Sequence, residues 1–110
     1  MKYMVQMLAF QPTKDGDPIV KRPVEVPDGD LKDADLLTKL GLVYQYGQND
    51  FQPIKDIVSV SAGDVIDLDG DNYLVCGVGF RKLTKEEYDR FVALPRRDRG
   101  FDSLGSEPNV

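Results

Sequence analysis

Apolar and polar residues alternate in short runs along much of the chain, as they do in strands that bury one face. The first run covers residues 4–10, with Val5 and Met7 on one side, and the second covers residues 19–26. A loop rich in Pro, Asp and Gly separates the two runs, so we expect them to pair as an antiparallel hairpin. Pro23 has no amide hydrogen, which places the second strand at an edge or a bulge of the sheet.

A helical period replaces the alternation after the turn at residues 27–30. Asp30 or Asp33 is the expected N-cap, with Asp35 favourably near the positive end of the helix dipole. Gly47 is expected to end the helix at the C′ position. The predicted apolar face follows the spacing i, i+1, i+4, i+7 and i+8 and consists of Leu36, Leu37, Leu40, Val43 and Tyr44.

The central stretch, residues 47–80, contains two apolar runs joined by a Gly/Asp/Asn turn. The runs at 60–68 and 73–78 with the turn at 69–72 predict a β-hairpin. Gly63-Asp64 interrupts the first run and is expected to form a turn or bulge. Gly77 and Gly79 leave one side of the second strand bare, which permits either a bend or the close approach of another backbone or a ligand.

A second helix is expected after this hairpin. Thr84 and Glu87 have the spacing of a capping box, a short apolar stripe follows, and Pro95 ends the helix. Residues 95–110 are polar, rich in turn formers and poor in apolar residues. We expect them to form a flexible C-terminal tail or an arm that becomes ordered on a partner.

These elements predict an α+β fold in a single domain at residues 1–94. It consists of a mostly antiparallel sheet of four to five strands, open or curled into a partial barrel, with two packed helices. The hairpin is the expected centre of stability. The predicted core consists of Val5, Met7, Leu37, Leu40, Val43, Val60, Ile66, Leu74, Cys76, Val78, Phe91 and Val92.

Composition and charge narrow the class of protein. The 110 residues are 41% hydrophobic and 30% charged, which is ordinary for a globular domain. The net charge of −5 disfavours nucleic acid as a partner, because phosphate binding needs clustered Lys and Arg. No apolar run approaches the length of a membrane span, and the N-terminus does not resemble a secretory signal. We therefore expect no membrane association and a cytoplasmic location.

The residue types needed for common catalytic sites are missing from the sequence. It contains no histidine, and its single cysteine, Cys76, lies in a strand pattern typical of a core thiol. The segment 67–72 lacks the glycine and glutamate spacing of an EF-hand, so we expect a hairpin turn there and no metal or other cofactor. A carboxylate pair, Asp50 with Asp56 or Asp64, remains for acid/base chemistry, but we expect no enzyme.

The best candidate for a binding site is the loop at residues 48–52. Its polar side chains flank one aromatic ring and could hold a peptide, a base or a backbone edge. The loop could equally cap the preceding helix, with the ring in the core. The acidic turn of the central hairpin is a second part of the predicted site. The predicted binding residues are Gln48, Asn49, Asp50, Phe51, Gln52, Asp69 and Asp71.

Several segments together resemble a family of small uncharacterised proteins encoded by bacteriophages, prophages and mobile elements. They are MLAF at 7–10, VEVP at 24–27, VYQYGQNDFQP at 43–53, SVSAGDVI at 59–66 and GF at 79–80. The resemblance covers residues 3–83 and leaves the C-terminal tail outside. It implies a setting in a phage or mobile element and implies no activity.

Two functions remain open at this point. The first is a non-enzymatic interaction protein of phage or mobile-element origin that binds a host or defence protein, with inhibition as one outcome. The second is a small β-barrel module that binds RNA or a nucleotide. The Ser-Val-x-x-Gly-Asp-x-Ile strand followed by Tyr-x-Val is similar to the barrel of ASCH and PUA-like domains. The acidic charge favours the first.

Overall fold

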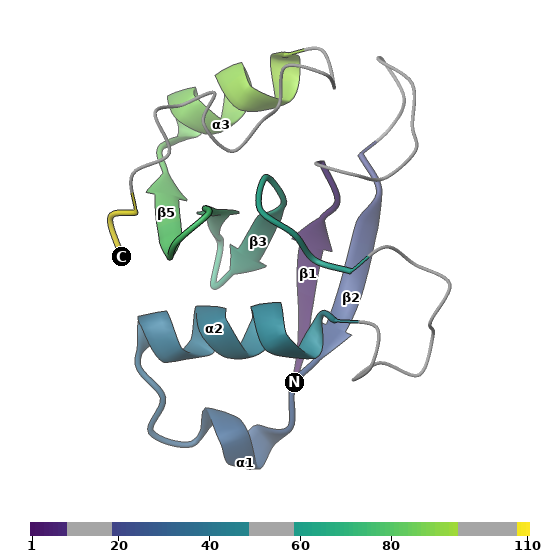
Figure 1. The fold of residues 1–110 in the computed structure, drawn as a ribbon, viewed down its shortest axis with the longest axis vertical. Helices are drawn as coiled ribbons and strands as arrows, with labels where there is room; N and C mark the ends of the chain where they lie inside the picture. Colours follow the sequence, from purple (N-terminus) through teal and green to yellow (C-terminus); the bar gives the residue numbers. More distant parts are fainter. Residues whose placement is uncertain (9–18, 49–58, 95–107) are drawn as a thin grey trace.

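The structure is a computed structural model that describes residues 1–8, 19–48, 59–94 and 108–110. Its strands form one antiparallel sheet in the order β2-β1-β3-β4-β5, and the sheet is open (Figure 1). This confirms the predicted α+β class, in its open form rather than as a partial barrel. The elements are β1 (Lys2–Gln6), β2 (Lys21–Glu25), α1 (Asp28–Leu31), α2 (Leu36–Tyr46), β3 (Val65–Leu68), β4 (Asp71–Val75), β5 (Phe80–Leu83) and α3 (Lys85–Ala93).

The two longer helices lie on opposite sides of the sheet (Figure 1). The face toward α2 carries the larger core, which includes Ile66 and Tyr73. The face toward α3 carries a smaller core around Phe91, which includes Val65 and Leu74. Because both faces are covered, consecutive residues of β3 and β4 are buried and the simple alternation breaks down there.

The predicted hairpin of the first two strands is confirmed. β1 pairs with β2 in a register that places Tyr3 opposite Val24 and Met4 opposite Pro23. β2 has a strand on one side only, so Pro23 lies on an edge strand, as expected. β1 also pairs with β3, with Val5 opposite Ile66, and this pairing joins the N-terminal hairpin to the rest of the sheet.

The predicted turn of the central hairpin is confirmed as well. Leu68 pairs with Asp71, and the two residues between them, Asp69 and Gly70, have φ angles of 53° and 87°. Positive φ at both loop positions is typical of the type I′ turn that suits antiparallel strands. The strand before the turn begins only at Val65, because Gly63 adopts a φ of 99° and turns the chain there.

The second strand of the hairpin is shorter than predicted. β4 ends at Val75, and a turn closed by the hydrogen bond from Cys76 N–H to the Gly79 carbonyl leads into β5, a separate strand that the pattern did not indicate. Gly79 has a φ of 76°, which permits this turn. Val78, predicted in the core, lies in the turn and is 82% exposed.

The predicted start and apolar face of the first helix need correction. Asp35 is the N-cap of α2, and its side chain accepts a 2.8 Å hydrogen bond from Thr38 N–H. Leu40 and Val43 face the core, whereas Leu37 is 49% exposed. The helix packs through a narrower stripe than its sequence offers. The exposed members of the predicted face are Leu36, Leu37 and Tyr44.

Gly47 follows α2, but for a different reason than predicted. Its φ of −74° is open to any residue, so it is not the left-handed C′ glycine of the expectation. A Cβ atom at Gly47 would lie 2.4 Å from the Val60 side chain. The glycine is therefore needed for the close packing of the helix end on Val60.

The second predicted helix is confirmed with its cap. Thr84 and Glu87 form the capping box of α3, and the Glu87 carboxylate also accepts a 2.8 Å hydrogen bond from Arg81 on β5. Of the other predicted core positions, Val92 is only partly buried, and the remainder are buried as expected: Val5, Met7, Leu40, Val43, Val60, Ile66, Leu74, Cys76 and Phe91.

The division into a domain at 1–94 and a tail at 95–110 stays a prediction, because residues 95–107 lie outside the described residues. The last three residues are placed beside β5. The backbone N–H of Asn109 donates to the Phe80 carbonyl at 3.1 Å.

Leu74, buried in β4, and Val78, exposed in the turn that follows, offer a matched test of which positions belong to the core. Leu74→Ala is expected to reduce the free energy of unfolding by about 2–4 kcal/mol, because it empties a fully buried site. Val78→Ala should change it by less than about 0.5 kcal/mol. Urea unfolding of both variants measures this. Similar losses in the two variants would contradict the placement of β4 in the core.

The Arg81–Glu87 pair predicts a pH-dependent part of the stability. The pKa of the Glu87 carboxyl lies below its ordinary value of 4.5. The main cause is the hydrogen bond from Arg81, and the second is the hydrogen bond from the Thr84 backbone. A depressed pKa stabilises the fold above pH 4.5, and the contribution is lost as the pH falls through the lower, folded-state pKa. Glu87→Gln is therefore expected to cost about 1 kcal/mol at pH 7 and less at pH 3.

Urea unfolding at both pH values measures the Glu87→Gln difference, with exposed Glu86→Gln as the control. Glutamine can still complete the capping box, so the substitution isolates the charge. An equal cost at both pH values would show that the charge of Glu87 does not stabilise the fold.

Candidate functional site

A shallow groove of about 440 Å³ lies where β1 begins and β3 ends. We call it the acidic groove, because exposed carboxylates line it beside apolar side chains. Asp69 reaches it from the type I′ turn and Asp67 from β3, while Tyr3 contributes from β1. The complete lining is Met1, Lys2, Tyr3, Met4, Asp67, Asp69 and Gly70.

The lining of the acidic groove carries both signs of charge, with the Asp67 and Asp69 carboxylates beside the ammonium groups of Lys2 and of the Met1 N-terminus. Burial raises the pKa of Tyr3, and the charges of Asp69 and Asp28 raise it further. The Tyr3 hydroxyl therefore stays protonated at neutral pH, and it donates to the Met1 sulfur at 3.4 Å. The carboxylates of the acidic groove can attract cationic groups of a partner.

The two predicted acidic residues of the hairpin turn are in different situations. Asp69 is exposed and has no ion pair among the described residues. Asp71 lies 3.5 Å from the Lys82 ammonium, and both of these side chains are about half exposed. Such a pair is loosely held and costs little to separate, so both carboxylates can meet a partner.

Only one residue of the predicted loop lies within the described part of the chain. The Gln48 side-chain amide donates to the Tyr44 carbonyl at 2.9 Å and to the Val60 carbonyl at 3.0 Å. Gln48 thus caps α2 and ties it to the segment before β3, which is the structural role weighed for this loop. Asn49, Asp50, Phe51 and Gln52 lie outside the described residues, and their role in binding stays a prediction.

The candidate catalytic groups that can be placed serve the fold. Asp64 is buried, and its carboxylate accepts hydrogen bonds from the backbone N–H groups of Leu8 at 2.9 Å and Ser61 at 2.8 Å. Asp50, its predicted partner, lies outside the described residues, as does Asp56, the other predicted partner of Asp50. Burial raises the pKa of the Cys76 thiol, which lowers its reactivity as a nucleophile.

Acidic and thiol side chains form no large cluster in the part of the chain that the structure describes. Within it, no group of three or more Cys, Asp or Glu side chains could hold a metal ion.

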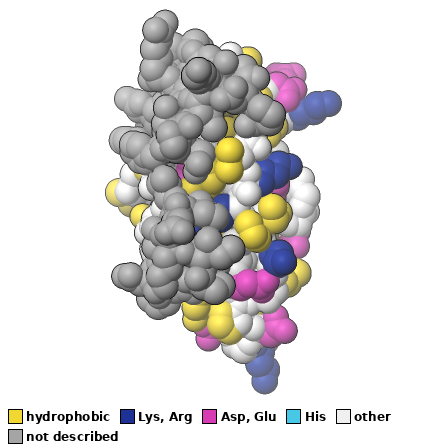
Figure 2. Space-filling view, turned by 90° about the vertical axis from the view of Figure 1, so that its right-hand side faces the viewer, with side chains coloured by type: hydrophobic (Ala, Val, Ile, Leu, Met, Phe, Trp, Pro, Cys, Tyr) yellow, Lys and Arg dark blue, Asp and Glu magenta, His cyan; other side chains and the backbone are white. Residues whose placement is uncertain are grey.

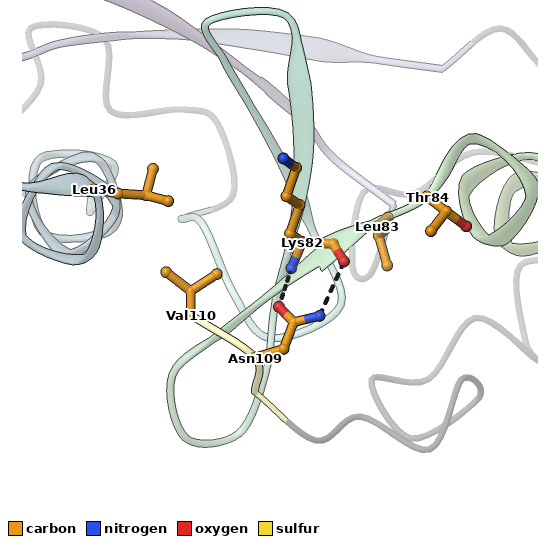
Figure 3. Close-up of a pocket in the computed structure, with 6 residues that line it drawn as sticks. All are labelled: Leu36, Lys82, Leu83, Thr84, Asn109 and Val110. Carbon is orange, nitrogen blue, oxygen red and sulfur yellow. Dashed lines mark hydrogen bonds between the residues drawn. The ribbon is translucent and has the colours of Figure 1, made fainter.

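A second hollow, of about 460 Å³, lies between the start of α2, the strand β5 and the end of the chain (Figure 3). We call it the β5 groove. Leu36 and Val110 face each other across it, and Asn109 lies along the backbone of Lys82 (Figure 3). Its remaining lining residues are Leu83 and Thr84. The sequence pattern did not indicate this hollow, because α2, β5 and residues 108–110 are far apart along the chain.

Two buried polar residues were missed because polar positions in a strand normally indicate a solvated face. Arg22 is only 2% exposed, opposite Val5 in the register of β1 and β2, and burial lowers its pKa. Gln6 is also 2% exposed. It accepts a hydrogen bond from the Tyr88 hydroxyl and donates to the Asn72 side chain, which joins α3 to the sheet.

Acidic and basic side chains of the described residues are interspersed on the face shown in Figure 2. None of the helices in the described ranges is long and apolar enough to cross a membrane. Comparison of the chain with protein-family models, with curated proteins and with solved structures finds no match.

The structural role of Gln48 predicts a loss of stability on truncation. Gln48→Ala removes two hydrogen bonds to main-chain carbonyls and is expected to cost about 1–2 kcal/mol. Gln45→Ala, an exposed site on the same helix, is the control and should be nearly neutral. Thermal and urea unfolding measure both. Equal stability of the two variants would show that the Gln48 side chain does not tie α2 to Val60.

Proposed function

We propose that the protein is a non-enzymatic interaction protein of phage or mobile-element origin that binds a host or defence protein in the bacterial cytoplasm. The acidic groove carries the proposal, since it joins exposed carboxylates to an apolar lining. That combination suits a protein surface on which Lys or Arg side chains surround apolar groups. The predicted loop at residues 48–52 would form a second part of the interface.

The charge of the groove supports a protein partner over a nucleic acid. Asp69 and Asp28 are close enough to Tyr3 to raise its pKa, so a phosphate group near this hydroxyl would be repelled. The net charge of −5 acts in the same direction over longer distances. A basic protein surface would instead be attracted by these charges, which would accelerate its association with the protein.

The RNA-binding barrel has less support. The described sheet is open, whereas the resemblance to ASCH and PUA-like domains concerned a barrel. The arginines expected to form a local basic face, Arg96, Arg97 and Arg99, lie outside the described residues. We keep this function as an outcome of the test below.

The test replaces the carboxylates of the turn and keeps its conformation. Asp69→Asn with Asp71→Asn removes two negative charges, and asparagine tolerates the positive φ of position 69. The control pair, Glu86→Gln with Asp89→Asn, removes the same charge from exposed positions of α3. We expect the first pair to weaken the captured protein complex about tenfold or more at an unchanged melting temperature, and the control to leave it nearly unchanged.

Other outcomes separate the remaining interpretations. Equal weakening by both pairs would reduce the effect to net charge and contradict a site at the acidic groove. Asn49→Ala with Asp50→Ala is expected to weaken the same complex without lowering the melting temperature. RNA or duplex DNA should not bind at about 150 mM salt. Micromolar nucleic-acid binding that is lost when Arg96, Arg97 and Arg99 are replaced would favour the RNA-binding module.

A further inference from the structure

The two edges of the sheet are protected in different ways. At the β2 edge the backbones of Lys21, Pro23 and Glu25 point outward, because the alternate residues bond to β1. Pro23 offers no N–H, and the side chains of Lys21 and Glu25 are exposed and charged. This edge therefore resists pairing with another strand. β5 has no proline, and of its outward-facing residues only Lys82 is charged.

The outward-facing backbone of β5 is covered by one residue from the end of the chain. The Asn109 side chain accepts a 2.6 Å hydrogen bond from Lys82 N–H and donates to the Lys82 carbonyl at 3.2 Å (Figure 3). Its own backbone N–H donates to the Phe80 carbonyl at 3.1 Å. Asn109 therefore bonds to β5 in the manner of a neighbouring strand.

The neighbours of Asn109 are accommodated on both sides. A Cβ atom on Gly79 would lie 2.9 Å from the Pro108 ring, so only glycine lets Pro108 come this close. Val110 is half-buried at the opposite end, where it packs on the larger core and faces Leu36 across the β5 groove. Pro108, Asn109 and Val110 thus contact the β5 edge in turn, through a ring, an amide and an aliphatic side chain.

These contacts are exchangeable, because Asn109 is exposed and its side-chain bonds to Lys82 lie at the surface. A segment from another molecule could make the same bonds and fill the remaining volume of the β5 groove. Strand addition of this kind draws affinity from main-chain bonds and specificity from side-chain pockets.

We propose that the β5 edge is a docking site for an extended peptide of another protein, and that residues 108–110 occupy it as an internal mimic. The fitting partner presents a side-chain amide opposite Lys82 and a small aliphatic residue next to it, as Asn109 and Val110 do. This site lies apart from the acidic groove and does not depend on the function proposed above.

The test uses the full chain with Asn109→Ala, and Gln45→Ala as the control that removes an exposed amide elsewhere. The probe is a synthetic acetylated peptide with the sequence SEPNV, that of residues 106–110. We expect the Lys82 amide to exchange its hydrogen about tenfold faster or more in Asn109→Ala than in the control. We also expect the peptide to bind this variant about tenfold more tightly than it binds the wild type, because the internal competitor is weakened.

The peptide SEPAV, which lacks the amide, should not compete with SEPNV. The chemical shifts that change on binding should belong to Phe80–Leu83. The proposal is overturned if Lys82 exchange is the same in both variants or if SEPNV fails to bind Asn109→Ala at millimolar concentration. A dimer of Asn109→Ala with protected β5 amides and no peptide binding would replace the peptide by a second copy of the chain.

Discussion

The buried carboxylate of Asp64 is the contact on which the assembly of the sheet depends. It accepts the backbone N–H of Leu8, just beyond β1, and that of Ser61, in the turn that leads into β3. The backbone carbonyl of the same residue accepts the N–H of Val75 at the end of β4. The side chain and the backbone carbonyl of Asp64 thus join three segments of the chain. A charged group can remain at this depth because backbone donors replace the water it has lost.

Local chemistry explains which parts of this fold could be predicted. The Thr84–Glu87 box, the Asp69-Gly70 turn and the edge position of Pro23 each depend on residues a few positions apart or on a missing N–H, and each was predicted correctly. The predicted apolar face of α2 was wrong in part. The burial of its leucines depends on contacts with the sheet and with Val60, which lie far away in the sequence.

The candidate site shows the same division. Asp69 and Asp71 were identified from their place in a turn, and the turn presents both at the surface. The acidic groove and the contact of Asn109 with β5 each bring together residues separated by tens of positions, and no periodicity in the sequence indicates such contacts. The burial of Gln6 could not be predicted either, because a polar residue in a strand normally indicates a solvated face. Its side chain is buried because the Tyr88 hydroxyl donates a hydrogen bond to it.

The pairing of β1 with β3 has a consequence for the order of folding. Met4 lies opposite Asp67, so this contact closes a loop of about sixty residues, whereas β1–β2 and the β3–β4–β5 meander each pair neighbours in sequence. Closing this loop costs conformational entropy before the hydrogen bonds and side-chain contacts between β1 and β3 can stabilise the sheet. We expect the two local units to form early and the seam between β1 and β3 to form last. During synthesis, the N-terminal hairpin must then wait for β3 to leave the ribosome before the sheet can close.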